Sequence, residues 1–103
     1  MKKIKAITCI VESGMAHKVV ESALGAGAQG ATIFFGVGTG VRQKAGSAGK
    51  RIKPDKDIIT IVTYEETVDK IFDAMVEAGK IKEPAKGFAF IQDVDRAIGF
   101  WDD

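Results

Sequence analysis

The chain has 103 residues and a mass of 11.0 kDa, which allows one hydrophobic core and leaves no room for a second. Hydrophobic residues make up 46% and charged residues 28%, an ordinary globular composition that excludes disordered and fibrous classes. The formal net charge is +1, so no overall field draws the protein to nucleic acid or to a membrane surface.

The single cysteine cannot form an internal disulfide, and one histidine with one cysteine is too few for a structural zinc site. The apolar stretch 6–11 follows a basic start, but it is too short for a signal peptide and is interrupted by Glu12. No run approaches the ~20 apolar residues of a membrane-spanning helix. We therefore expect one soluble cytoplasmic domain over residues 1–103, without membrane insertion, metal or obligatory cofactor.

The first half of the chain predicts a strand, a helix and a strand. Residues 3–11 are apolar on both faces when read as a strand. Ser13 is placed to cap a helix over residues 15–24, whose apolar side chains form one stripe, and Gly25 and Gly27 end it. Residues 31–37 predict a second strand, again apolar on both faces.

Residues 42–56 differ from the rest in composition. They carry six cations and one anion, and Ile52 is their only large apolar side chain. Ordering such a segment costs roughly 1–2 kcal/mol per residue in backbone entropy, with almost no apolar burial to offset it. We expect a mobile basic loop, which a ligand or partner would order.

The second half repeats the order of the first. Residues 57–63 predict a strand, and Thr63 with Glu66 predicts a capping box for the helix that follows. This helix carries one apolar stripe, ends at Gly79, and leads through a loop over residues 80–86 to a last strand over residues 87–94. The order βαββαβ predicts an α+β fold, a ferredoxin-like sandwich.

This fold has a consequence for assembly. Two helices can cover only one face of a four-stranded sheet, yet at least three strands are apolar on both faces. An exposed apolar face of that size is not tolerated well by a monomer. We expect a closed homo-oligomer.

The glycine-rich stretch at 36–44 reads Gly36-Val-Gly38-Thr-Gly40-Val-Arg42-Gln43-Lys44. Glycines at alternate positions let backbone N–H groups approach an anion, and the cations that follow supply charge. A dinucleotide-binding fold would require a helix after these glycines, whereas a loop follows here. The alternatives are a phosphate or nucleotide contact and a flexible strand exit with solvated cations.

Lys86-Gly87-Phe88-Ala89-Phe90-Ile91 fits the opening of an RNA-binding consensus. It follows the second helix rather than preceding it, however, and the first strand has no companion aromatic residue. We interpret Phe88 and Phe90 as core or interface side chains and expect no nucleic-acid partner; an RNA-binding, RRM-like module is the alternative. Cys9 reads as inert packing and His17 as a solvated side chain, so nothing predicts an enzyme.

Residues 27–44 resemble the PII family of signal-transduction proteins, which act in nitrogen regulation. Gly27-Ala-Gln29-Gly30-Ala-Thr32 is similar to the family's Gly-Val-Gln-Gly-Met-Thr. Gly38-Thr-Gly40-Val-Arg42-Gln43-Lys44 is similar to its Gly-Phe-Gly-Arg-Gln-Lys, with one additional residue at 41. The order of elements agrees over nearly the whole chain.

The resemblance implies a homotrimer whose intersubunit clefts bind adenine nucleotides. It also implies that the mobile loop, the family's T-loop, reports the ligand state to a target, either a membrane transporter or an enzyme. The residues it assigns to the nucleotide are Gly30, Thr32, Gly38, Gly40, Arg42, Gln43, Lys44, Val62, Gly79, Lys80, Lys86 and Gly87.

Three departures from the family pattern bear on the ligand. The second nucleotide loop has Lys82-Glu83-Pro84-Ala85-Lys86-Gly87 in place of Gly-Asp-Gly-Lys, and the T-loop is shorter and lacks a tyrosine. The family's C-terminal arginines correspond to Gly99 and Trp101. Each lost contact between a cation and a phosphate removes about 1.5–3 kcal/mol. We therefore expect ADP or AMP rather than ATP as the effector.

A second hypothesis is a small trimeric binding protein akin to the divalent-cation-tolerance proteins, which share the fold. The scarcity of cysteine and histidine weakens it, because transition metals favour thiolate and imidazole ligands.

Overall fold

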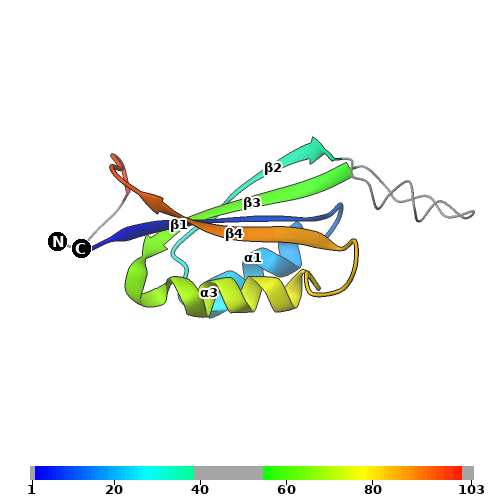
Figure 1. Ribbon diagram of the computed structural model, residues 1–103, viewed down its shortest axis with the longest axis horizontal. Coiled ribbons are helices and arrows are strands. Elements are labelled where there is room, and N and C mark those ends of the chain that lie inside the picture. The colour runs from blue at the N-terminus through cyan, green and yellow to red at the C-terminus, as the bar shows by residue number, and fades with distance from the viewer. Residues whose placement is uncertain (1, 39–54, 101–103) are drawn as a thin grey trace, which may run out of the picture.

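The computed structural model describes residues 2–38 and 55–100, so most of the predicted loop 42–56 lies outside the described residues. Four strands form one antiparallel sheet in the order β2-β3-β1-β4, and both helices pack on the same face (Figure 1). The elements are β1 (Ile4–Glu12), α1 (Ala16–Gly25), β2 (Thr32–Val37), β3 (Asp55–Tyr64), α3 (Glu65–Ala78) and β4 (Gly87–Val94). The expected ferredoxin-like α+β fold is confirmed.

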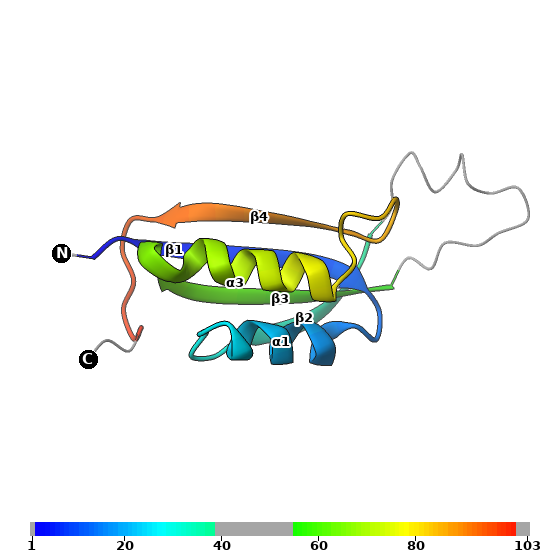
Figure 2. The same cartoon turned by 90° about the horizontal axis from the view of Figure 1, so that it is seen from below.

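The core lies between the sheet and the two helices. Strand register places Ile7 opposite both Ile61 and Ile91, and Cys9 opposite Ile59 and Ala89, all on the face that the helices cover. Helix α3 lies against β1 and α1 against β3 (Figure 2). Four side chains of the predicted apolar helix stripes are fully buried against this face: Val19, Ala23, Ile71 and Met75. Cys9 is packing, as expected, and burial raises the pKa of its thiol to about 11.

The start of α1 differs from the sequence expectation. Met15 is the N-cap residue and makes no side-chain capping hydrogen bond, so Ser13 is not the cap. Instead, Oδ2 of Asp57 accepts hydrogen bonds from the backbone N–H groups of Gly14 (2.9 Å) and Ala16 (3.0 Å). The capping carboxylate therefore comes from β3, where the tertiary fold brings it against the end of the helix.

The expected capping box at Thr63 and Glu66 is also wrong. Strand β3 continues to Tyr64, so Tyr64 is the N-cap of α3, and it makes no side-chain capping hydrogen bond. Thr63 points into the helix-covered face, and its hydroxyl lies 2.7 Å from that of Thr67. Pairing with β1 keeps Thr63 within strand β3, so Thr63 cannot be the N-cap residue that the capping box requires.

The other face of the sheet carries the second apolar set that the sequence predicts. Phe34, Ile58, Ile10 and Phe88 follow one another in register across all four strands. The described residues leave Phe34 51% and Phe88 60% exposed. We call these four residues the apolar row. The edge strand β2 is also exposed on its helix side, at Phe35 and Val37, and its end rises away from the helical layer (Figure 1).

Candidate functional site

A pocket of about 270 Å³ lies where β2, β3 and the segment after β4 meet. It contains three of the residues predicted to bind a nucleotide, Gly30, Thr32 and Val62. The full lining is Gln29, Gly30, Ala31, Thr32, Thr60, Val62, Gly99 and Phe100. We call it the β2–β3 pocket.

Strand register builds the polar and apolar parts of this pocket. Thr32 lies opposite Thr60, and Val62 follows two residues along β3 on the same face of the sheet. Phe100 closes the pocket from the segment after β4, where its ring meets Tyr64 edge-on at 5.3 Å between centroids.

The chemistry of the β2–β3 pocket suits a flat, uncharged ring that carries hydrogen-bonding atoms. Val62 and Phe100 offer apolar and aromatic contact surface, while the Gln29 carboxamide and the Thr32 and Thr60 hydroxyls offer hydrogen bonds to ring nitrogens and hydroxyl groups. Within the part of the chain that the structure describes, its lining holds no charged side chain.

Two of the predicted glycines, Gly79 and Gly87, are explained by packing. A Cβ atom on Gly79 would lie 2.8 Å from Cγ1 of Val11, and one on Gly87 would lie 2.4 Å from the backbone oxygen of Ile10. At both positions glycine lets the chain pass close to β1. Packing therefore explains both glycines, and no ligand contact is needed to explain them.

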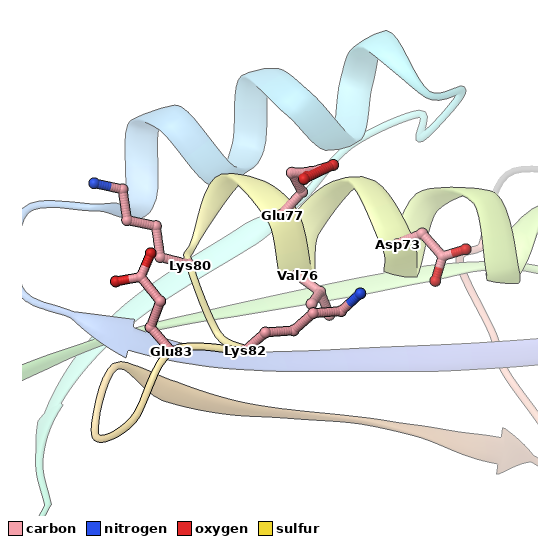
Figure 3. Close-up of a pocket in the computed structure, with 6 residues that line it drawn as sticks. All are labelled: Asp73, Val76, Glu77, Lys80, Lys82 and Glu83. Carbon is pink, nitrogen blue, oxygen red and sulfur yellow. The ribbon is translucent and has the colours of Figure 1, made fainter.

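Lys80, another predicted residue, lines a different depression, of about 380 Å³, beside the end of α3 (Figure 3). Lys80 adopts a left-handed backbone conformation with φ of 57°, which turns the chain after the helix. Three carboxylates share this depression with two lysines; its lining is Asp73, Val76, Glu77, Lys80, Lys82 and Glu83. The surplus of negative charge opposes a phosphate group there.

Lys86 lies at neither pocket. Its Nζ atom is 3.4 Å from Oε1 of Glu12, at the end of β1 where the last strand begins. Gly38 lies near the same end of the sheet, because a Cβ atom there would be 3.5 Å from Cγ of Lys56. The other predicted residues, Gly40, Arg42, Gln43 and Lys44, lie outside the described residues.

The residues predicted to bind a nucleotide thus lie in two separate places within a single chain. The β2–β3 pocket is at the edge strand β2, whereas Lys86 is beside β4, at the opposite edge of the sheet. Val62 pairs with Ala6 near the start of β1, whereas Lys86 adjoins the end of β1. The structure of a single chain does not bring them into one site.

The structure also shows where the other residues considered from the sequence lie. Phe88 and Phe90 lie side by side on the edge strand β4, with ring centroids 5.6 Å apart. His17 is exposed, and its Nε2 atom lies 3.2 Å from Oε2 of Glu21, one helical turn away. In residues 2–38 and 55–100, no group of three histidine, cysteine or acidic side chains could hold a metal ion. No helix in those ranges is long and apolar enough to cross a membrane.

Four residues that contribute to these sites were not among those assigned to the nucleotide from the sequence. Gln29 and Thr60 line the β2–β3 pocket, and alternation along β3 could have identified Thr60 as sharing a face with Val62. Phe100 lines it because the tail folds back over Tyr64, and no local pattern signals that return. Glu12 contacts Lys86 across 74 positions of sequence.

Comparison with known proteins agrees with this architecture. A family model described as "Nitrogen regulatory protein P-II" matches residues 1–100. Among solved structures, that of an Arabidopsis thaliana PII protein bound to citrate is similar, with a TM-score of 0.68 and 19% sequence identity. The match covers 90% of this chain and 78% of that one, and it shows the common fold. No curated protein sequence matches the chain.

Proposed function

Because the chain belongs to the nitrogen regulatory protein P-II family, we propose that it is a ligand-sensing regulator that binds an adenine nucleotide. The nucleotide lies in a cleft between subunits of a homotrimer, and its binding orders the basic loop 42–56. The loop then contacts a target protein, either a membrane transporter or an enzyme. In this scheme the protein regulates its target and catalyses no reaction.

The observation that carries this proposal is the lining of the β2–β3 pocket. Gly30, Thr32 and Val62, which the family resemblance assigns to the nucleotide, lie together there. The pocket joins an aromatic ring, an aliphatic side chain and hydrogen-bonding groups without a charge. That combination favours the adenosine part of a nucleotide over its phosphates.

The separation of the two residue groups supports a cleft between subunits. A phosphate attached to adenosine in the β2–β3 pocket needs cations, and the described lining supplies none. A second copy of the chain, placed with the start of its β4 beside the start of β2 in the first, would bring Lys86 to that pocket. The exposed apolar row and the exposed side chains of β2 offer the surface for such contacts.

The same reasoning favours AMP or ADP over ATP. Gly99 lines the β2–β3 pocket at a position where the resemblance calls for an arginine, and Trp101 lies outside the described residues. Each missing contact between a cation and a phosphate forgoes about 1.5–3 kcal/mol. We therefore expect the third phosphate to add little affinity.

Calorimetric titration with AMP, ADP and ATP tests the proposal. We expect dissociation constants in the micromolar range or weaker, with ATP gaining less than about fivefold over ADP. A Gly30→Leu variant should abolish binding, because a Cβ atom on Gly30 meets open space and a larger side chain would fill the pocket without a clash. Gly25→Leu is the matched control, since Gly25 has equally open surroundings outside the pocket.

A variant in the basic loop tests the contribution of charge. Arg42→Ala should weaken nucleotide binding about tenfold, which corresponds to the loss of one charge-assisted contact. If none of the three nucleotides binds at millimolar concentration, the nucleotide function is wrong. If Gly30→Leu binds as well as Gly25→Leu, the ligand lies elsewhere.

A further inference from the structure

A row of charged residues lies at the end of the sheet from which the basic loop departs. In the register of β3 and β1, Lys56 lies opposite Glu12. In the register of β1 and β4, Val11 lies opposite Gly87, so Glu12 adjoins Lys86 at the next position. The Glu12 carboxylate pairs with the second of these lysines, since its Oε1 lies 3.4 Å from Nζ of Lys86.

The backbone around Lys86 holds this residue beside Glu12. Gly87 passes so close to β1 that a Cβ atom would lie 2.4 Å from the Ile10 oxygen. The turn before it is closed by hydrogen bonds from the N–H of Glu83 to the oxygen of Lys80 (3.0 Å) and from the N–H of Lys86 to the oxygen of Glu83 (3.3 Å). The position of Lys86 at the end of β1 is thus set before any ligand arrives.

The pair between Lys86 and Glu12 is weak enough to be exchanged. The side chain of Lys86 is 37% exposed and that of Glu12 is 46% exposed, so water screens the attraction. A phosphate oxygen carries more charge than a carboxylate oxygen and forms stronger hydrogen bonds with an ammonium group. After the exchange, however, the displaced carboxylate remains close to the phosphate and repels it.

We propose that Glu12 is an internal competitor for anionic ligands: it occupies Lys86 in the free protein and lowers the affinity for phosphate groups. The proposal rests on the nucleotide function, because Lys86 is one of the residues assigned to the nucleotide. It makes Glu12 a specificity-determining residue, since the repulsion grows with each phosphate that the ligand carries. Glu12 then disfavours ATP more than AMP.

Calorimetric titration of Glu12→Gln and Glu12→Ala with AMP, ADP, ATP and inorganic pyrophosphate tests this proposal. Both variants should raise the affinity for ADP about fivefold, for ATP by more and for AMP by less, and should make pyrophosphate bind more tightly. The gain in affinity should shrink as the salt concentration is raised from 50 to 500 mM, because salt screens the repulsion between the Glu12 carboxylate and the phosphate groups. Glu66→Gln, which removes an exposed carboxylate on α3 that lines neither pocket, is the control and should leave every affinity unchanged.

A double variant shows whether the effect acts through the lysine. In a Lys86→Gln background, the further change Glu12→Gln should bring little or no gain. Pyrophosphate separates this proposal from the nucleotide function, because it carries no adenosine. If pyrophosphate binding improves while no nucleotide binds, the role of Glu12 is supported and the nucleotide function is wrong.

Unchanged or weaker binding of ADP, ATP and pyrophosphate by folded Glu12→Gln and Glu12→Ala overturns the role of Glu12. The same conclusion follows if neither variant binds any of the four probes. A gain that persists undiminished in the Lys86→Gln background also overturns it, since the carboxylate would then act elsewhere. Thermal melting of each variant shows that the comparison is made between folded proteins.

Discussion

Asp57 shows how much one buried side chain contributes to the joint between two elements. Only 3% of its surface is exposed, and its Oδ2 accepts the N–H groups of Gly14 and Ala16. The N–H of Ala16 is one of the donors that a helix start otherwise leaves without an intrahelical partner, and Gly14 lies just before the N-cap residue Met15. The carboxylate also lies where the positive end of the α1 dipole favours a negative charge. Asp57 therefore ties the beginning of α1 to β3.

We predict that Asp57→Ala lowers the free energy of unfolding by about 1–3 kcal/mol, because two N–H groups lose their acceptor in a buried setting. Urea unfolding followed by circular dichroism measures the loss. Asp55→Ala is the control, since Asp55 lies two residues earlier on the same strand face and is exposed. A loss for Asp57→Ala no larger than for Asp55→Ala would contradict the capping role.

At the scale of elements, glycine permits β4 to join the sheet where it does. The chain turns after α3 through left-handed conformations at Lys80 and Ala85 and then enters the strand at Gly87. The strand begins in close contact with the Ile10 carbonyl and continues in register with β1. The same approach positions Lys86 for its contact with Glu12.

Gly87→Ala should lower the free energy of unfolding by about 1–3 kcal/mol, because its Cβ would lie 2.4 Å from a backbone oxygen that cannot move aside. Gly25→Ala is the matched substitution in open space and should be neutral or stabilising, since alanine favours the helix. Denaturant melts of the two variants test the difference. If both behave alike, the contact at Gly87 does not restrict the strand.

At the scale of the whole molecule, the sheet face opposite the helices bears on the oligomeric state of the protein. The apolar row runs unbroken across all four strands, and its outer members are more than half exposed in a single chain. The edge strand β2 has no buried residue, although its sequence is almost wholly apolar. Exposed apolar surface of this kind is typical of faces that other subunits cover.

We predict that sedimentation equilibrium gives a mass of about three times 11.0 kDa, as a trimer requires. Phe34→Lys should lower this mass to that of the monomer, because it places a charge in the apolar row that the other subunits would cover. Leu24→Lys is the control: Leu24 is 47% exposed, against 51% for Phe34, and lies on the helical layer. A wild-type monomer at micromolar concentration would exclude the trimer and the cleft between its subunits.

Much of the fold could be predicted from local patterns. Strand β4 has the predicted limits, α3 ends at Gly79, and both helices bury the predicted stripe except at Leu24, which is exposed. These features depend on residues that are near each other in sequence, where periodicities of 2.0 and 3.6 identify the buried face. The apolar character of both sheet faces follows from the same alternation, and with it the prediction of an oligomer.

The tertiary structure decided the contacts between distant residues. Asp57 caps a helix that begins 41 positions earlier, Lys86 meets Glu12 across 74 positions, and Phe100 closes a pocket built by β2 and β3. Such contacts depend on strand register, and a shift of one residue would turn each side chain to the opposite face. Composition and periodicity do not fix that register; the packing of the two helices and the close approach of Gly87 to β1 do.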